Sequence, residues 1–171
     1  MSNFKEDLMK VKAFAFDVDG VLSQQFVPMF PNGEPMRTAN IKDGFALQLA
    51  VKLGYRIAII TGGKTEAIAN RYQSLGIEDV FMGVSEKLPV FNGWIEKHGL
   101  SADEVMYMGD DIPDLPVMRV VGLAVAPADA AEEVKSVSKY ISDRNGGQGC
   151  VRDVVEQVLR VHHHWGNDHT W

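Results

Sequence analysis

The residues with the clearest chemical potential are two aspartates at the end of a short apolar run. Asp17 and Asp19 follow VKAFAF at residues 11–16, and one valine separates them. A carboxylate can attack phosphorus and form an aspartyl-phosphate, which divides a difficult hydrolysis into two easier steps. A second carboxyl two residues further on can protonate the leaving alkoxide and later activate water. A lone pair with this spacing is more often a turn or a helix cap, so other residues must decide between these interpretations.

Residues of complementary chemistry follow other apolar runs. Thr61 comes directly after YRIAII at residues 55–60, and Lys87 begins a helical pattern after VFMGVS. Three acids lie in GDDIPD, after EVMYM: Asp110, Asp111 and Asp114. Clustered carboxylates repel one another unless a cation joins them, and hard oxygen ligands suit Mg²⁺. A metal ion, a hydroxyl and an ammonium group together predict phosphoryl transfer, because that reaction needs the charge of the phosphoryl oxygens neutralised.

These side chains need a fold that brings the ends of several strands together. Short apolar runs alternate with longer segments of helical spacing, and several runs are apolar on both faces. On the helix expected within residues 44–54, Phe45, Leu49 and Leu53 are predicted to share the buried face. The alternation predicts an α/β fold of Rossmann type, a parallel sheet with helices on both faces. The predicted strands are residues 11–16, 55–60, 79–82, 104–108 and 122–126, and a further helix is expected within 65–76.

One segment interrupts this alternation between the first strand and the first helix. FVPMFPNGEPMRTANI, residues 26–41, holds three prolines and the pair Asn32-Gly33. Asn-Gly favours a type I′ turn, so we predict a projecting β-hairpin over about residues 24–41, with its prolines at edge positions. The segment is too short for an inserted domain. The whole chain, residues 1–171, is therefore predicted to form one domain.

Composition narrows the classes of partner. The 171 residues are 46% apolar with a formal net charge of −6, which argues against nucleic acid but not against a small anionic substrate bound with a metal ion. Cys150 is the only cysteine, which excludes an internal disulfide and fits a reducing compartment. The charged N-terminus resembles neither a signal peptide nor a membrane span. We therefore expect a cytoplasmic protein with no membrane partner.

At this point the motifs resemble those of haloacid-dehalogenase-like phosphohydrolases. DVDG, ITG, a single lysine and GDD occur in the order typical of that family, over about residues 12–153. The resemblance implies that Asp17 is the nucleophile and that Asp19 is the general acid/base, with its backbone carbonyl on Mg²⁺. It assigns Thr61 and Lys87 to phosphoryl binding. It implies Asp17 and Asp110 as metal ligands, with Asp111 and Asp114 in support, orienting water ligands or Lys87.

Most phosphatases of this superfamily carry a cap domain, for which this chain has no room. It is similar to a capless subgroup that acts on eight- and nine-carbon sugar-acid phosphates. Members of that subgroup have a hairpin after the first motif and a glycine-rich tail, here from about residue 144. They form tetramers in which a neighbour's hairpin and tail help to close the site. The resemblance therefore implies a homotetramer.

Substrate-binding candidates lie near the predicted strand ends. Nine-carbon enzymes of the subgroup carry a glutamate immediately after TG, and this chain has Gly63 there, which favours an eight-carbon acid. Lys42 and Arg71 are expected to face the strand-end pocket, where cations suit a substrate with a carboxylate as well as a phosphate. Solvated surface charges are the alternative for both. The full set of candidates is Asn40, Lys42, Gly62, Gly63, Lys64 and Arg71.

Three other interpretations remain open. A nine-carbon sugar-acid phosphatase, or a nucleotidase, small sugar phosphatase or phosphomutase, would keep the fold and change the substrate. A non-enzymatic phospho-receiver domain shares the acids, threonine and lysine, but its phospho-accepting aspartate follows a central strand that comes later in the chain. A scaffold protein would lack a catalytic residue, and none is missing. The tail VHHHWGNDHTW, residues 161–171, is expected to be loosely packed rather than a metal site.

Overall fold

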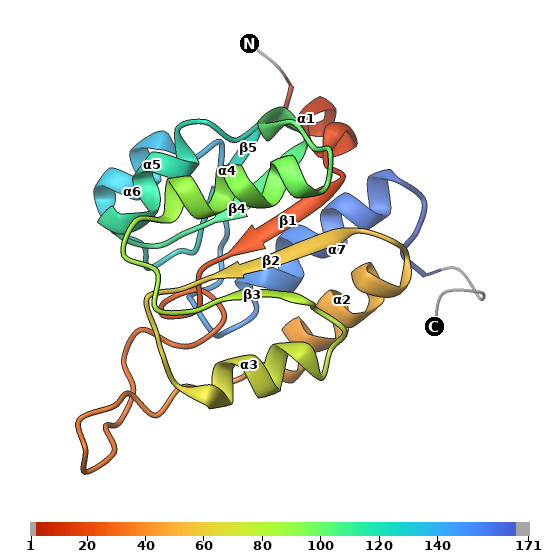
Figure 1. Ribbon diagram of the computed structural model, residues 1–171. Coiled ribbons are helices and arrows are strands. Elements are labelled where there is room, and N and C mark those ends of the chain that lie inside the picture. Colours follow the sequence, from red (N-terminus) through yellow and green to blue (C-terminus); the bar gives the residue numbers. More distant parts are fainter. Residues whose placement is uncertain (1–2, 167–171) are drawn as a thin grey trace.

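The computed structural model describes residues 3–166 and shows one parallel sheet between two layers of helices (Figure 1). The sheet order is β3-β2-β1-β4-β5-β6, and every neighbouring pair is parallel. The first five strands lie where the sequence predicts them, whereas the two-residue β6 was not predicted. The strands are β1 (Ala13–Phe16), β2 (Arg56–Ile60), β3 (Asp79–Phe81), β4 (Val105–Met108), β5 (Leu123–Ala126) and β6 (Tyr140–Ile141).

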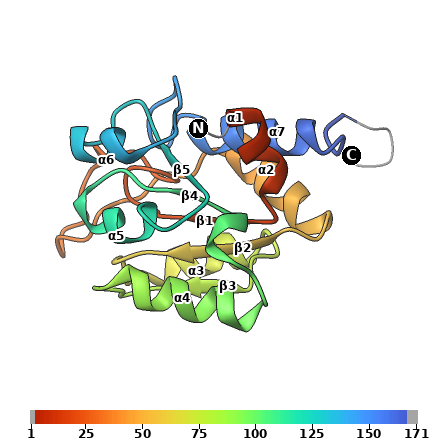
Figure 2. The ribbon, with the colours of Figure 1, turned by 90° about the horizontal axis from the view of Figure 1, so that it is seen from above.

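The helices cover both faces of the sheet, as predicted (Figures 1 and 2). One layer contains α1 (Phe4–Lys10), α2 (Ile41–Lys52), α3 (Glu66–Gln73) and α7 (Cys150–Val161). The other layer contains α4 (Lys87–Lys97), α5 (Leu115–Met118) and α6 (Glu132–Val137). Two 3₁₀ turns, Ala102–Glu104 and Ile112–Asp114, flank β4. Among the described residues, no helix has the length and apolar character needed to cross a membrane.

Two cores follow from the alternation of side chains along each strand. In β1, Phe14 and Phe16 face the layer that contains α7, whereas Ala13 and Ala15 face the layer that contains α4. All four side chains are fully buried. Small residues on one face let the helices of that layer approach the sheet closely. The central strand is therefore packed on both faces, and this packing sets the position of the residue that follows it.

Some sequence expectations differ from the structure. Phe45 was expected on the buried face of α2, but it is 39% exposed, because Leu47 and Ala50 face the sheet instead. The glycine-rich tail continues into the twelve-residue helix α7, which was not predicted. Its buried residues follow a helical period that could have been recognised: Val151, Val154, Val155, Val158 and Leu159.

The histidine-rich tail was expected to be loosely packed, but Val161 and Trp165 pack against the core. His162 and His164 bond to Tyr55. The end of the tail, residues 167–171, lies outside the described residues.

Residues 24–40, which we call the arm, project from the end of β1 (Figure 1). The arm folds back on itself through one antiparallel bridge, between Met29 and Pro35. The expected type I′ turn is wrong, because it needs a positive φ at both Asn32 and Gly33 and only Gly33 has one, at 86°. Pro31, whose ring holds φ near −65°, takes the second position of a turn closed by Gly33 N–H donating to the Phe30 carbonyl at 2.8 Å.

Candidate active site

The strand order creates a crevice at the carboxyl end of the central strands. From β1 the chain proceeds outward to β2 and β3, then crosses back to β4 on the other side of β1. The loops after β1 and β4 therefore leave the sheet in opposite directions, and open α/β sheets bind ligands at such a point. A cavity of about 550 Å³ lies there, lined by residues that include Asp17, Asp19, Thr61, Lys87 and Asp110.

Asp17 is held firmly at the tip of β1. Its backbone N–H donates to the Met108 carbonyl at 3.2 Å, which extends the pairing of β1 with β4 by one residue. Its carboxylate accepts the Val18 N–H at 2.7 Å and lies 3.1 Å from the Lys87 ammonium. Only 12% of the Asp17 side chain and 4% of the Lys87 side chain are exposed. A carboxylate aimed into a cavity beside a fixed ammonium can act as a nucleophile toward an anionic group that the ammonium binds.

Asp114, which is fully buried, organises the loop after β4. One carboxylate oxygen accepts from the Lys87 ammonium at 2.7 Å and from the Tyr107 hydroxyl at 2.6 Å. The other accepts the backbone N–H groups of Asp110 at 3.0 Å and Asp111 at 3.3 Å. Four donors occupy the acceptor capacity of a carboxylate, so Asp114 positions Lys87 and Asp110 instead of binding a ligand itself.

Thr61 lies directly after β2 and is almost fully buried. Its side-chain oxygen accepts the Gly63 N–H at 3.1 Å, and its carbonyl accepts the Val84 N–H at 3.0 Å. These bonds fix the turn that begins at Gly62 and leave the hydroxyl hydrogen free to donate. The structure therefore brings Thr61, Lys87 and both aspartates of the first motif to one cavity, together with Gly62, Gly63, Asp110 and Asp111.

Asp17 and Asp110 lie close together in this cavity and repel one another. Burial, together with the charge of Asp114, raises the pKa of Asp17 to about 7, and Lys87 offsets only part of this. Burial and the charges of Asp17 and Asp114 raise the pKa of Asp110 to about 8. Burial also opposes the charge on Lys87, but Asp17 and Asp114 outweigh it and raise the pKa of that ammonium. Lys87 also lowers the pKa of Asp110, but too little to offset burial and the neighbouring acids.

This donor set fits a divalent cation. Ligand atoms of Asp17, Asp110 and Asp114 lie within 4.8 Å of one another, and the bonds of Asp114 leave the first two to face the cavity. The backbone also closes around this point, because a Cβ on Gly20 would overlap the Asp110 carboxylate and φ there is 81°. Carboxylate oxygens in a polar cavity are the donors that Mg²⁺ prefers. A bound cation would also remove the repulsion that raises both pKa values.

Sequence reasoning missed Arg37, which lies near the base of the arm. Its Nε donates to Asp19 Oδ1 at 2.8 Å and its Nη2 to Asp19 Oδ2 at 3.0 Å, a two-pronged pair. Its Nη1 donates to the Thr65 hydroxyl at 3.1 Å. The only sequence signal was an arginine in a segment that returns toward the strand ends. The contact itself depends on how the arm folds.

Four of the predicted substrate-binding residues do not line this cavity. Lys42 lines a separate polar groove beside α7, and Asn40 caps α2 by accepting the N–H groups of Lys42 and Asp43. Arg71 packs against Gly44 of α2, under the arm, because its side chain leaves α3 toward α2. The Lys64 side chain lies along Gly83. Within one chain, therefore, the cations expected near the substrate carboxylate point elsewhere.

The geometry defines a class: a parallel α/β fold with an aspartate at the tip of its central strand, facing a cavity that a lysine, a threonine and a second pair of aspartates also line. A family model described as haloacid dehalogenase-like hydrolase matches residues 83–153. The 3-deoxy-D-manno-octulosonate 8-phosphate phosphatase of Escherichia coli (strain K12) is 38% identical over 149 residues, which cover 87% of this chain and 79% of that protein. The Yersinia pestis enzyme of the same name is 34% identical over 149 residues, which cover 87% of this chain and 80% of that protein.

Solved structures agree with this assignment. The crystal structure of the Moraxella catarrhalis 3-deoxy-D-manno-octulosonate 8-phosphate phosphatase, in complex with magnesium, phosphate and KDO, has a TM-score of 0.87 and 33% identity. The match covers 92% of this chain and 90% of that one. The chain belongs to the 3-deoxy-D-manno-octulosonate 8-phosphate phosphatase family of haloacid dehalogenase-like hydrolases. This membership sets aside the phospho-receiver and scaffold alternatives.

Proposed function

We propose that the protein is a Mg²⁺-dependent phosphatase that hydrolyses 3-deoxy-D-manno-octulosonate 8-phosphate to the free sugar acid (KDO) and phosphate. The observation that carries this is the Asp17 carboxylate, 3.1 Å from the Lys87 ammonium and facing Asp110 across a cavity at the strand ends. The identity of the substrate is inferred from the relatives of the chain. We further propose that the enzyme acts in the cytoplasm, in the synthesis of a lipopolysaccharide precursor.

In the first chemical step, Asp17 attacks phosphorus and the bond from phosphorus to the sugar oxygen breaks. The electron pair of that bond goes to the sugar oxygen, which takes a proton from the carboxyl group of Asp19. The product is an aspartyl-phosphate on Asp17. Lys87 and the Thr61 hydroxyl bind phosphoryl oxygens, and the buried contacts of Lys87 with Asp114 keep its ammonium in place.

In the second step, Asp19 takes a proton from water, and the water oxygen attacks the phosphorus of the intermediate. The bond from phosphorus to the Asp17 oxygen breaks, which releases phosphate and restores the carboxylate. Mg²⁺ would be held by Asp17, Asp110 and the backbone carbonyl of Asp19, and it supplies neutralisation of charge on the transferring group.

Phosphate release from a panel of esters tests this function. The panel contains 3-deoxy-D-manno-octulosonate 8-phosphate, a nine-carbon sugar-acid 9-phosphate (of the KDN or N-acetylneuraminate type) and glucose 6-phosphate, each with Mg²⁺ and with EDTA. We expect the eight-carbon acid to lead in kcat/KM by at least about tenfold, which is about 1.4 kcal/mol of transition-state discrimination. EDTA should abolish turnover. Preference for the nine-carbon acid, which is the alternative, or equal hydrolysis of glucose 6-phosphate would contradict the assignment.

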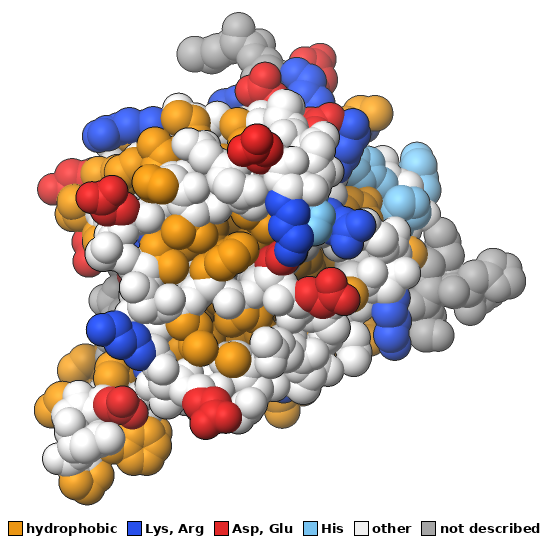
Figure 3. All heavy atoms as spheres, in the orientation of Figure 1, with side chains coloured by type: hydrophobic (Ala, Val, Ile, Leu, Met, Phe, Trp, Pro, Cys, Tyr) orange, Lys and Arg blue, Asp and Glu red, His pale blue; other side chains and the backbone are white. Residues whose placement is uncertain are grey.

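We also propose that the protein is a homotetramer in which the arm of one subunit covers the site of another. The arm carries large exposed apolar side chains, visible at the lower left of Figure 3. Phe26, which also lines the catalytic cavity, is 93% exposed, and Met29 is 73% exposed. Covering such side chains and excluding water from the site would both favour assembly.

Light scattering tests the assembly. We expect a tetrameric mass for the wild type and a smaller mass for a double variant, Phe26→Ser with Met29→Ser. The matched control is Ile112→Ser, which removes an exposed apolar side chain (49% exposed) outside the arm. A fully active monomer would contradict the proposal.

A further inference from the structure

The position of Arg37 carries an inference about how the enzyme selects its substrate. Its guanidinium grips both oxygens of Asp19, the proposed general acid/base, and is anchored by Thr65 at the start of α3. The Arg37 side chain is 13% exposed and that of Asp19 is 49% exposed. Arg37 therefore lies where the arm meets the catalytic cavity, with its charge directed at a residue of the cavity wall.

Gly63 makes room for this guanidinium. A Cβ on residue 63 would lie 2.7 Å from Arg37 Nη2 and 3.1 Å from Arg37 Cζ, so any side chain would displace it. Gly63 and Asp19 both line the catalytic cavity. Lys42 and Arg71, the cations that the sequence suggested for the substrate carboxylate, point away from the cavity. Arg37, in contrast, lies against two residues that line it.

The observed pair does not suit proton transfer. Each Asp19 oxygen accepts an N–H from the same guanidinium, so the carboxylate is held in the plane of that fork and turned toward Arg37, whereas a proton donor must turn one oxygen toward the leaving sugar oxygen. An anion that offered Arg37 the same two-pronged geometry would release Asp19. A second carboxylate is the group that matches this fork best.

We propose that Arg37 is the receptor for the substrate carboxylate, and that it exchanges Asp19 for this group when the substrate binds. The inference rests on the proposed function, since it needs a substrate with a carboxylate as well as a phosphate. Exchange frees Asp19 for catalysis only when a sugar acid is bound. A neutral sugar phosphate leaves Asp19 held, so recognition of the carboxylate is coupled to activation of the general acid.

The test compares two substrates in three variants. We measure kcat and KM for 3-deoxy-D-manno-octulosonate 8-phosphate and for glucose 6-phosphate in Arg37→Ala, Arg37→Lys and the control Arg56→Ala. Arg56 is an exposed cation at the start of β2, at the opposite end of the sheet. Arg37→Ala should lose about 10- to 100-fold in kcat/KM on the sugar acid. Its activity on glucose 6-phosphate should rise, because Asp19 is no longer held.

Two further readouts separate recognition from a structural role. Inhibition by free KDO, which has the carboxylate and no phosphate, should weaken by a similar factor in Arg37→Ala. Arg37→Lys should recover only part of the preference, because an ammonium cannot grip both oxygens of a carboxylate in a planar fork. Melting curves confirm folding, and Arg37→Lys carries the same comparison if Arg37→Ala does not fold.

The outcomes are distinguishable. Equal losses on both substrates, or a preference for the acid that survives in Arg37→Ala, would overturn the role of Arg37 and leave the proposed function intact. A wild type without any preference for the sugar acid would overturn the proposed function and this inference together.

Discussion

Aspartates at the two ends of the sheet have pKa values shifted in opposite directions. At the carboxyl end, Asp17 and Asp110 face one another in a cavity, and burial and mutual repulsion raise both pKa values. At the other end, Asp79 begins β3 and accepts hydrogen bonds from Trp94 at 3.1 Å, Lys97 at 2.8 Å and His98 at 2.7 Å. Burial alone would raise the pKa of Asp79, but these three donors outweigh it and lower that pKa.

We interpret this difference as one of role: Asp17 and Asp110 are placed for chemistry, whereas Asp79 stabilises the fold. The donors around Asp79 satisfy its charge within the chain, so nothing further is needed there. The charge of Asp110 is only partly offset, by Lys87, and a bound divalent cation would offset the rest. Carboxylates with raised pKa values therefore indicate a functional site when a bound ligand can remove the repulsion between them.

The largest expected effect is on turnover at the carboxyl end. Asp17→Asn keeps the shape of the side chain and removes the nucleophilic charge, so kcat should fall at least about 10³-fold. Asp19→Asn should be nearly as damaging, because the leaving oxygen then receives no proton. Phosphate release measures both. Melting temperature should hold or rise in Asp17→Asn, since one of two repelling carboxylates is gone. Turnover above a few per cent of wild type in Asp17→Asn would require a different nucleophile.

The matched change at the other end should have the reverse profile. Asp79→Asn removes the charge that Lys97 and His98 bind, and we expect a loss of about 1–3 kcal/mol in the free energy of unfolding. Urea denaturation measures this loss. The value of kcat should stay within about twofold of wild type, because Asp79 lies at the end of β3 remote from the cavity. A large loss of turnover in Asp79→Asn without a loss of stability would contradict the structural role of Asp79.

The pH dependence of stability should differ in sign between the two ends. Without metal, Asp17 and Asp110 have raised pKa values, so the folded state binds more protons than the unfolded state between about pH 4 and pH 8. Their contribution to stability therefore falls as pH rises through this range. Asp79, whose pKa is lowered, contributes stability above about pH 4 that is lost in acid.

Melting temperatures with EDTA and with Mg²⁺ test this sign. Mg²⁺ binds deprotonated carboxylates, so its stabilisation should grow from about pH 5 to about pH 8. Asp43, whose pKa burial raises to about 6, adds to the slope in EDTA but should not respond to Mg²⁺. Asp79→Asn should retain the Mg²⁺ response, and Asp17→Asn should lose most of it. A shift with Mg²⁺ that does not change with pH would contradict the proposed ligands.

The sequence could predict the acids of the site because each follows an apolar run, and parallel strands deliver their ends to one edge. It could also predict the strands that bear them, since runs buried on both faces have a plain pattern. It could not predict the contact between Arg37 and Asp19, because this depends on the path of an irregular arm. The position of Arg71 against Gly44 depends likewise on how α3 packs on α2.

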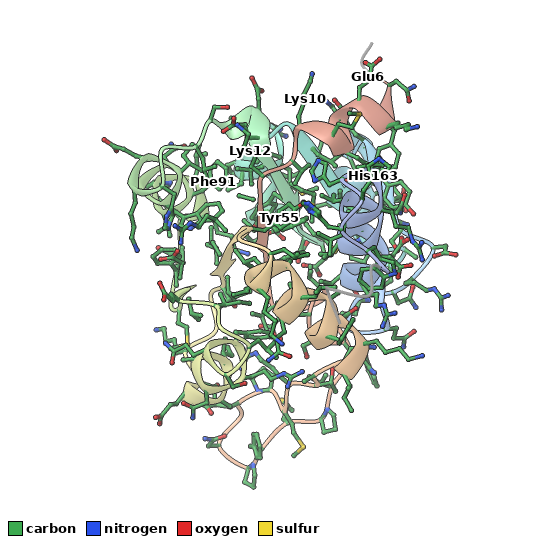
Figure 4. The ribbon with its side chains drawn as sticks, turned by 90° about the vertical axis from the view of Figure 1, so that its right-hand side faces the viewer. Glu6, Lys10, Lys12, Tyr55, Phe91 and His163 are labelled. Carbon is green, nitrogen blue, oxygen red and sulfur yellow. The ribbon has the colours of Figure 1, made fainter. Side chains whose placement is uncertain are left out.

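The smallest expected effect concerns Tyr55 and the end of α7, on the side of the molecule that Figure 4 shows. The Tyr55 hydroxyl lies 2.6 Å from His162 Nδ1 and 3.1 Å from His164 Nδ1. His162 Nε2 lies 2.9 Å from the Met9 carbonyl, which can only accept, so Nε2 carries the hydrogen. Tyr55 then donates to His162 Nδ1 and accepts from His164, and this network joins α1 to the residue before β2 and to the turn after α7.

Tyr55→Phe removes the hydroxyl and keeps the ring, which packs against Phe14 and His162. Two hydrogen bonds are lost, but His162 is partly exposed, so water can replace the hydroxyl at its Nδ1 and we expect a loss of about 1 kcal/mol. In a chain of this size that corresponds to a fall of about 2–4 °C in melting temperature. Turnover and the Mg²⁺ response should be unchanged, because the network lies at the amino end of the sheet and the catalytic groups lie at the carboxyl end. If Tyr55→Phe lowered kcat as well, the two ends of the sheet would be coupled, and the division between stability and chemistry would not hold.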